Sequence, residues 1–162
     1  MSGNAFLVSL FEHKAWCNTG LAGALRAGRD GMEPMAWAVA LLTFEHTHRV
    51  DRVFKARLEG TAPGVTAVVG DAVPDLDALA RRMAAMDAWY VDYAARVTQA
   101  ELAGIVAFTY LSDGEPGRMT RGDILGHVIT HGASHRGAIG KMLEPLGVAG
   151  APDMMTTFRR PA

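Results

Sequence analysis

Hydrophobic residues recur every three or four positions along most of the chain, and short breaks at glycine and proline interrupt this pattern. Such spacing places apolar side chains on one face of an α-helix, and four long segments show it. The expected helices run from about Asn4 to Ala27, from about Pro34 to Gly60, from Pro74 and Asp75 onward, and from Thr120 onward. The pattern therefore predicts an all-α fold rather than alternating strands and helices.

The connections between these segments complete the prediction. In the third segment the apolar positions alternate steps of three and four, as in a bundle seam: Leu76, Leu79, Met83, Met86, Tyr90, Tyr93 and Val97. Residues 61–73 read as a loop, and Thr120 with Asp123 forms an acidic variant of the capping box. Residues 105–119 combine a β-favouring run with a turn signal. We therefore predict one four-helix bundle domain over residues 1–162, with a short hairpin or irregular crossover before the last long helix.

Composition limits the classes of function. The 162 residues are 49% hydrophobic, which suffices for the core of one domain, and 16 lysines and arginines nearly balance 17 acidic residues. Without a basic patch, nucleic acid is not an expected partner. The beginning of the chain lacks the pattern of a signal peptide, and no stretch approaches the roughly 18 apolar residues of a membrane span. We expect a cytoplasmic protein that does not bind membranes.

Histidine is the residue that could dominate a metal site, because the sequence has six histidines and Cys17 is its only cysteine. His131 and His135 lie four positions apart on the apolar ridge of the fourth helix, so their imidazoles can converge on one ion. His127 lies at the margin of this ridge, roughly 12 Å along the helix axis from His135. One ion cannot easily bind all three, so a stable site needs a ligand from another helix.

The second helix offers His46 and His48, which point to nearly opposite sides. The stripe of His46 is apolar on both sides, whereas that of His48 runs on into Asp51 and Lys55, so His46 is the better inward candidate. Three neutral imidazoles from two helices would leave coordination positions open, as in a catalytic metal site.

Other interpretations of these residues stay open at this stage. Inward histidines can also be core residues that satisfy their nitrogens by separate hydrogen bonds, and spacing alone does not decide between this and a metal site. Cys17 shares a ridge with His13 and is a fourth ligand, a nucleophile or a small buried hydrophobe. Arg136 lies off the histidine ridge and either bonds to a neighbouring helix or faces a substrate.

Three blocks of the chain resemble the DinB/YfiT family of metalloenzymes, which is distinct from the similarly named DNA polymerase. These are LFEHKAWCN near the start, FEHTHRVDRVFKARLEG in the middle and TRGDILGHVITHGASHRGAI towards the end. The resemblance spans nearly the whole chain, and its most specific part is HVITHGASHRG. It implies a four-helix bundle, commonly a homodimer, with a metal triad that falls on His46, His131 and His135.

The resemblance also implies a cofactor and a reaction class. The cofactor is a divalent ion such as nickel, zinc, iron or manganese, and relatives include S-transferases and isomerases that use bacillithiol, mycothiol or glutathione. Ala138 stands where many relatives have a glutamine, so a polar substrate contact is not expected at that position.

The leading functional hypothesis is a metal-dependent transferase that uses a low-molecular-weight thiol and an electrophilic substrate. A metal-dependent hydrolase, a non-catalytic metal-binding stress or sensor module and a purely structural bundle dimer are the alternatives. No catalytic residue is assigned, because the helix angles of Glu45 and Asp51 do not place either carboxylate beside the ligand histidine as a general base.

Overall fold

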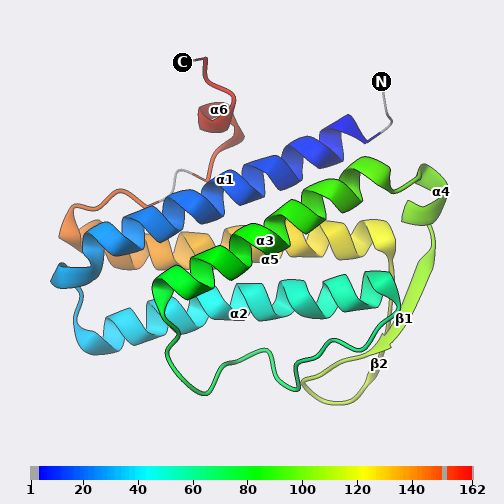
Figure 1. The fold of residues 1–162 in the computed structure, drawn as a ribbon, viewed down its shortest axis with the longest axis horizontal. Coiled ribbons are helices and arrows are strands. Elements are labelled where there is room, and N and C mark those ends of the chain that lie inside the picture. Colours follow the sequence, from blue (N-terminus) through cyan, green and yellow to red (C-terminus); the bar gives the residue numbers. More distant parts are fainter. Residues whose placement is uncertain (1–3, 151–152, 162) are drawn as a thin grey trace.

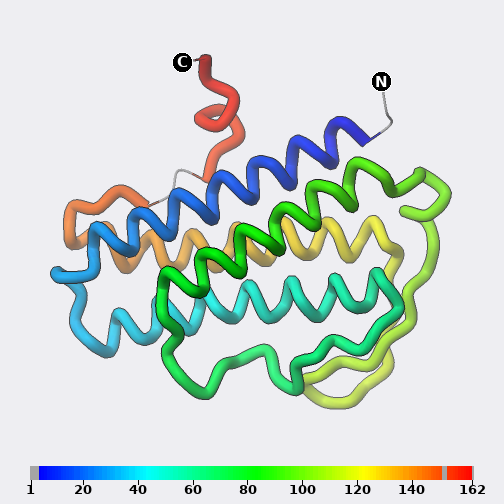
Figure 2. The backbone as a smooth tube through the Cα atoms, viewed as in Figure 1, coloured from blue at the N-terminus to red at the C-terminus, as the bar shows by residue number. Residues whose placement is uncertain are grey.

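Four long helices lie side by side along the length of the molecule (Figure 1), and the backbone trace shows their short connections (Figure 2). The computed structural model describes residues 4–150 and 153–161. In chain order the elements are α1 (Ala5–Gly28), η1 (Arg29–Gly31), α2 (Pro34–Glu59), α3 (Leu76–Arg96), α4 (Gln99–Leu102), β1 (Ile105–Thr109), β2 (Pro116–Thr120), α5 (Arg121–Leu143), η2 (Glu144–Leu146) and α6 (Met155–Phe158). The predicted all-α bundle is confirmed.

The ends of the long helices follow from local chemistry. Helix α2 begins at Pro34 and ends before Gly60, whose φ of 71° is a left-handed conformation that glycine adopts without strain. The side chain of Asp75 accepts a hydrogen bond from the Ala78 amide at 2.8 Å and caps α3. Thr120 and Asp123 form the expected capping box at the start of α5. The predicted starts of the second, third and fourth helices are therefore confirmed.

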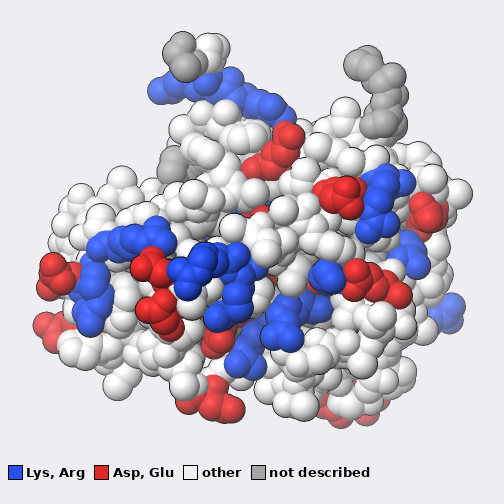
Figure 3. Space-filling model, viewed as in Figure 1, with Lys and Arg blue, Asp and Glu red and all other residues white. Residues whose placement is uncertain are grey.

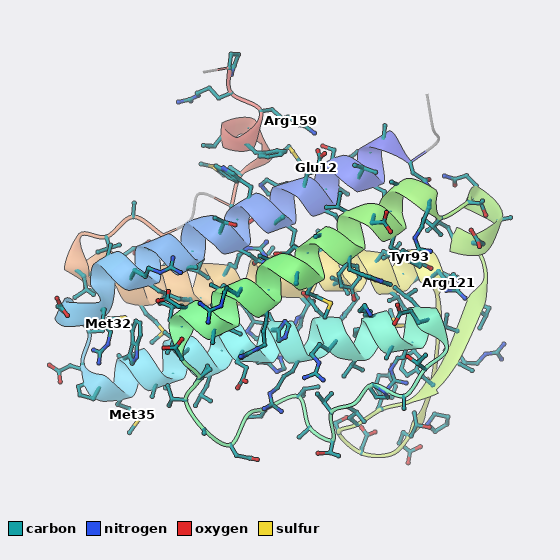
Figure 4. The ribbon with its side chains drawn as sticks, in the orientation of Figure 1. Glu12, Met32, Met35, Tyr93, Arg121 and Arg159 are labelled. Carbon is teal, nitrogen blue, oxygen red and sulfur yellow. The ribbon has the colours of Figure 1, made fainter. Side chains whose placement is uncertain are left out.

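Residues 105–119 contain a hairpin, one of the two structures expected there. Strands β1 and β2 pair antiparallel, from Ile105 opposite Thr120 to Thr109 opposite Pro116. The short helix α4 before the hairpin was not predicted, although Thr98 and Glu101 form a capping box for it. At this end of the bundle Arg121 donates to the Leu58 carbonyl at 2.7 Å and to the Tyr93 hydroxyl at 3.0 Å (Figure 4). These bonds tie the start of α5 to α2 and α3.

Two apolar clusters form the core, one at each end of the bundle. The first includes Leu25, Leu41 and Leu143, and the second includes Phe11 and Tyr90. Between them the helices carry buried polar side chains instead, namely Lys14, Asn18, His48, Asp51, Asp87 and Arg136. A polar layer thus crosses the middle of the hydrophobic core.

The sequence-based assignment of the two stripes on α2 was partly wrong. Met35 and Val39 were expected to point inward, but both side chains are exposed. The stripe that contains His48 and Asp51 is buried instead. The reason lies on other helices, because the amine of Lys14 on α1 bonds to the Asp51 carboxylate at 2.7 Å and so allows this charge to be buried.

The ridge on α5 also differs from the expectation. His131 and His135 are half-buried, and the fully buried face of this helix runs through Val128, Gly132 and Arg136. Gly132 brings α5 close to α1, since a Cβ there would lie 3.7 Å from the Lys14 side chain. The two histidines therefore lie beside the buried face of α5 rather than at its centre.

The molecular surface in Figure 3 carries positive and negative side chains interspersed along the helices, without a field of one sign on this face. In the described part of the chain, the helices are too short or too polar to span a membrane.

Candidate metal centre

Three histidines from two helices meet at one point. His46 comes from α2, and His131 and His135 come from successive turns of α5. The Nε2 atom of His131 lies 3.1 Å from Nε2 of His46 and 3.1 Å from Nε2 of His135. One nitrogen of each imidazole lies within 4.8 Å of the other two. The structure thus brings together the three residues that the sequence selected.

A backbone carbonyl orients the His46 ring. Nδ1 of His46 lies 3.0 Å from the carbonyl oxygen of Val68, in the loop between α2 and α3. Because a carbonyl only accepts hydrogen bonds, the ring carries its proton on Nδ1 and presents a lone pair at Nε2. A histidine that ligates a metal is commonly held in this way through its other nitrogen.

The imidazoles on α5 favour the neutral form. Burial, together with the neighbouring His135 and His46, lowers the pKa of His131 to about 4. Burial and His46 also lower the pKa of His135. Neutral imidazole is the form that binds metals, so this environment keeps both side chains competent as ligands at neutral pH.

Hydrogen bonding alone leaves this cluster incompletely satisfied. Nε2 of His131 carries either one proton or one lone pair, so at most one of its two contacts is a hydrogen bond. Among the described residues, Nδ1 of His131 is also buried without a hydrogen-bond partner. Two nitrogens bound to one ion at about 2.1 Å lie roughly 3.0 to 3.4 Å apart for ligand angles of about 90° to 110°. The observed spacing of 3.1 Å fits a shared ion.

The remaining histidines lie outside this cluster. His127 stacks on His131 with ring centroids 5.2 Å apart, and the centroid of the Phe54 ring lies 4.9 Å from that of His127. His48 is buried in the polar layer, on the other face of α2 from His46. His13 belongs to a separate group, with Cys17 of α1 and Asp153 of the C-terminal segment.

The two carboxylates considered as general bases are engaged elsewhere. Asp51 is paired with Lys14. Glu45 lies 3.6 Å from Arg49 and 3.9 Å from Arg82. These partners agree with the expectation that neither carboxylate serves the ligand histidine.

Sequence reasoning missed the polar layer that supports this part of the bundle. Lys14 also bonds to Asp87 at 2.5 Å, and Asn18 donates to the other oxygen of Asp87 at 2.8 Å. Arg136 donates to Asn18 at 3.0 Å, which confirms that Arg136 bonds to a neighbouring helix. The available signal was Asp87 itself, which interrupts the apolar ridge of α3 between Met83 and Tyr90.

An apolar cavity of about 350 Å³ lies near the converging histidines and has His127 in its wall. It shares Val68 and His127 with their surroundings, since the Val68 carbonyl holds His46 and the His127 ring covers His131. Its other walls come from α2 and the hairpin, including Phe54, Phe108, Tyr110 and Met119. Among the described residues that line the cavity, Arg57 alone carries a charge.

Cys17 is fully buried and lies outside the cluster formed by the three converging histidines, so it is not a fourth ligand there. Burial, together with a hydrogen bond to Asp153, raises the pKa of its thiol to about 12. The thiolate is the reactive form of cysteine, and a raised pKa disfavours it. The structure therefore does not support a role for Cys17 as a nucleophile.

We expect His48→Gln to weaken the dependence of stability on acid pH. Burial, together with the positive charges of Arg82 and Arg52, lowers the pKa of His48 to about 4. Between pH 6.5 and 4 the unfolded chain therefore binds a proton that the folded chain does not. The stability from neutral His48 is fully present above about pH 6.5 and is lost as the pH falls towards 4.

Urea unfolding at several pH values, with a chelator present, measures this effect. Between pH 6.5 and 4, the free energy of unfolding should fall more steeply with decreasing pH in the wild type than in the variant. The difference between the two slopes should reach about 1.4 kcal/mol per pH unit. Equal slopes would contradict the prediction.

The sequence model of the DinB family matches residues 36–162. No significant match to a curated protein or to a solved structure was found. The matched region contains most of α2 and all of α3, the hairpin and α5, and therefore all three converging histidines. The chain belongs to the DinB family.

Proposed function

We propose that this DinB-family protein is a metal-dependent transferase that uses a low-molecular-weight thiol, with His46, His131 and His135 as the metal ligands. The observation that carries the proposal is the convergence of three imidazole nitrogens from α2 and α5, with contacts of 3.1 Å. Three protein ligands are typical of catalytic sites, because they leave a coordination position for a substrate.

A divalent ion at this position would supply a Lewis acid that lowers the pKa of a bound thiol. The protein keeps His131 and His135 neutral and directs the lone pair of His46 through the Val68 carbonyl. Imidazole ligands suit nickel, zinc and iron, and manganese is also compatible with family membership.

The nearby cavity supports an apolar electrophilic substrate. Phe54, Phe108 and Met119 provide non-polar walls that exclude water from the bound molecule. Arg57 lies over the Phe108 ring at 4.3 Å and donates to the Thr109 carbonyl, so its charge is held at the wall. An electrophile bound in this cavity would contact His127, whose ring stacks on that of His131.

Elemental analysis of untagged protein, without metal added after lysis, tests the ligand set. We expect near-stoichiometric divalent metal at the triad of the parent protein, and therefore a total metal content that is lower by about one ion per chain in His46→Ala. His127→Gln is the matched control, because this histidine stacks on His131 without joining the cluster. Unchanged metal content in His46→Ala, or equal loss in His127→Gln, would contradict the assignment.

Turnover assays then test the reaction. The metal-loaded protein is assayed with bacillithiol, mycothiol and glutathione against a panel of apolar electrophiles. Thiol-dependent product that disappears in His46→Ala would support transfer. Loss of the electrophile at the same rate without thiol would instead identify a hydrolase.

A further inference from the structure

A second group of metal-ligand side chains lies where α1 meets the C-terminal segment. Sγ of Cys17 is 3.4 Å from Nε2 of His13 and 3.2 Å from Oδ1 of Asp153. The same nitrogen of His13 lies 3.9 Å from Oδ1 of Asp153. A sulfur, a nitrogen and an oxygen thus face one point, although Asp153 is 136 residues from Cys17.

These separations fit a small tetrahedral ion. Zinc binds sulfur at about 2.3 Å, and nitrogen and oxygen at about 2.0 to 2.2 Å, so adjacent ligands lie roughly 3.3 to 3.7 Å apart. The three observed distances lie within a few tenths of an ångström of this range. In a nucleophilic triad the carboxylate would orient the far ring nitrogen instead. Here the sulfur and the carboxylate face the same nitrogen, which is the geometry of a ligand cluster.

The second oxygen of Asp153 has a separate partner. Nε of Arg136 donates to Oδ2 of Asp153 at 2.6 Å, and the Arg136 side chain is buried. This bond orients the carboxylate and leaves Oδ1 directed at Cys17 and His13. Partners of this kind commonly position ligating carboxylates.

The surroundings of the cluster restrict water. Cys17 is fully buried, and the side chains of His13 and Asp153 are only 12% and 19% exposed. The rings of Trp16 and Phe158 pack against His13 with centroids 6.0 Å and 5.6 Å away. An apolar shell of this kind strengthens the binding of a cation to its ligands.

The C-terminal segment is held on α1 at further points. Arg159, which directly follows α6, lies 3.5 Å from the carboxylate of Glu12 on α1, and Figure 4 shows the two residues close to each other. Arg159 also donates to the Ser9 hydroxyl. These contacts place α6 over one side of the cluster, and Arg136 fixes the other side.

We propose that His13, Cys17 and Asp153 form a second divalent-metal site, for a thiophilic ion of the zinc type, that ties the C-terminal segment to α1. Binding forms one metal–sulfur bond, and the Cys17 thiol proton passes to solvent, without oxidation or reduction. Thiolate selects zinc or cobalt over magnesium and manganese. This site is independent of the histidine triad and of the proposed transferase activity.

Cobalt titration of the metal-free full chain tests the site. A cobalt–thiolate bond gives a near-ultraviolet charge-transfer band, and this band can come only from Cys17, the sole cysteine of the sequence. With a phosphine reductant in place of a thiol, we expect the band in the wild-type chain, where the triad binds a further cobalt, and saturation of the band at one cobalt per chain once the triad is disrupted. It should be retained in His131→Ala, which disrupts the triad, and lost in Cys17→Ser. Zinc should displace the bound cobalt, whereas manganese should not.

Two further variants keep Cys17 and remove one of the other ligands. His13→Ala and Asp153→Ala should each weaken cobalt binding, followed by the same band, at least about tenfold. Circular dichroism confirms that each variant is folded. A full chain without the band would overturn the proposal, as would unchanged affinity in either of these variants.

Discussion

We expect Lys14→Met to lower the free energy of unfolding by about 3 to 5 kcal/mol. The Lys14 amine lies between the carboxylates of Asp51 and Asp87, at 2.7 Å and 2.5 Å, and all three side chains are almost fully buried. Burial by itself lowers the pKa of Lys14, but the two carboxylates raise it above its usual value, so the amine stays charged. Removing this charge leaves two buried carboxylates that repel each other. Urea unfolding at pH 7 measures the loss.

Lys141→Met is the matched control. Lys141 also pairs with a carboxylate, that of Glu144 at 2.9 Å, but its side chain is 75% exposed. Removing the Lys141 charge should lower the free energy of unfolding by less than about 1 kcal/mol. In a second test, Asp51→Asn and Asp87→Asn are added to Lys14→Met and should recover part of the lost stability. If Lys14→Met and Lys141→Met lowered the free energy of unfolding by equally small amounts, the charge of Lys14 would not stabilise the fold through Asp51 and Asp87.

The second large effect expected is stabilisation by metal through the histidine triad. At a free nickel or zinc concentration of 100 times the dissociation constant, ligand linkage adds about 2.7 kcal/mol to the free energy of unfolding. Parent protein should gain this amount over His131→Ala, which removes the central imidazole of the cluster. Comparing the two proteins cancels any stabilisation by metal bound outside the triad. Thermal and urea unfolding with and without a chelator give the measurement.

A different histidine substitution checks that this gain is specific. His127→Gln changes the ring stacked on His131 but keeps all three converging nitrogens, so it should retain most of the gain. An equal gain in parent protein and in His131→Ala would show that metal binds elsewhere, and it would remove the basis of the transferase proposal. The expected homodimer stays a prediction and does not enter this test.

The order and limits of the long helices could be predicted from sequence because their signals are local. Pro34 suits the first turn of a helix, Gly60 accommodates a left-handed end, and Thr120 with Asp123 satisfies the free amides at the start of α5. Each signal acts within one helical turn. The spacing of His131 and His135 is local in the same sense, so their convergence was predictable.

Whether His46 or His48 faces His131 and His135 depends on contacts with other helices as well as on the sequence of α2. The predicted residue was brought to the cluster, but the reasoning from apolar stripes was only partly right, since Met35 and Val39 are exposed while His48 and Asp51 are buried. Hydropathy predicts a polar side chain to be exposed, and a buried partner on another helix overrides that preference.

The sequence by itself determined the helices, their caps and the histidine spacing on α5, because neighbouring residues set these features. Only the tertiary structure decided what the buried charges do: Lys14 meets Asp51 and Asp87 from 37 and 73 residues away, and Asp153 reaches Cys17 across 136. The position of Asp87 within the apolar face of α3 hints at a buried charge, but local periodicity does not identify a partner so far away in the chain. The charges are buried because the packing of several helices brings each to its partner, and that pairing offsets the cost of removing them from water.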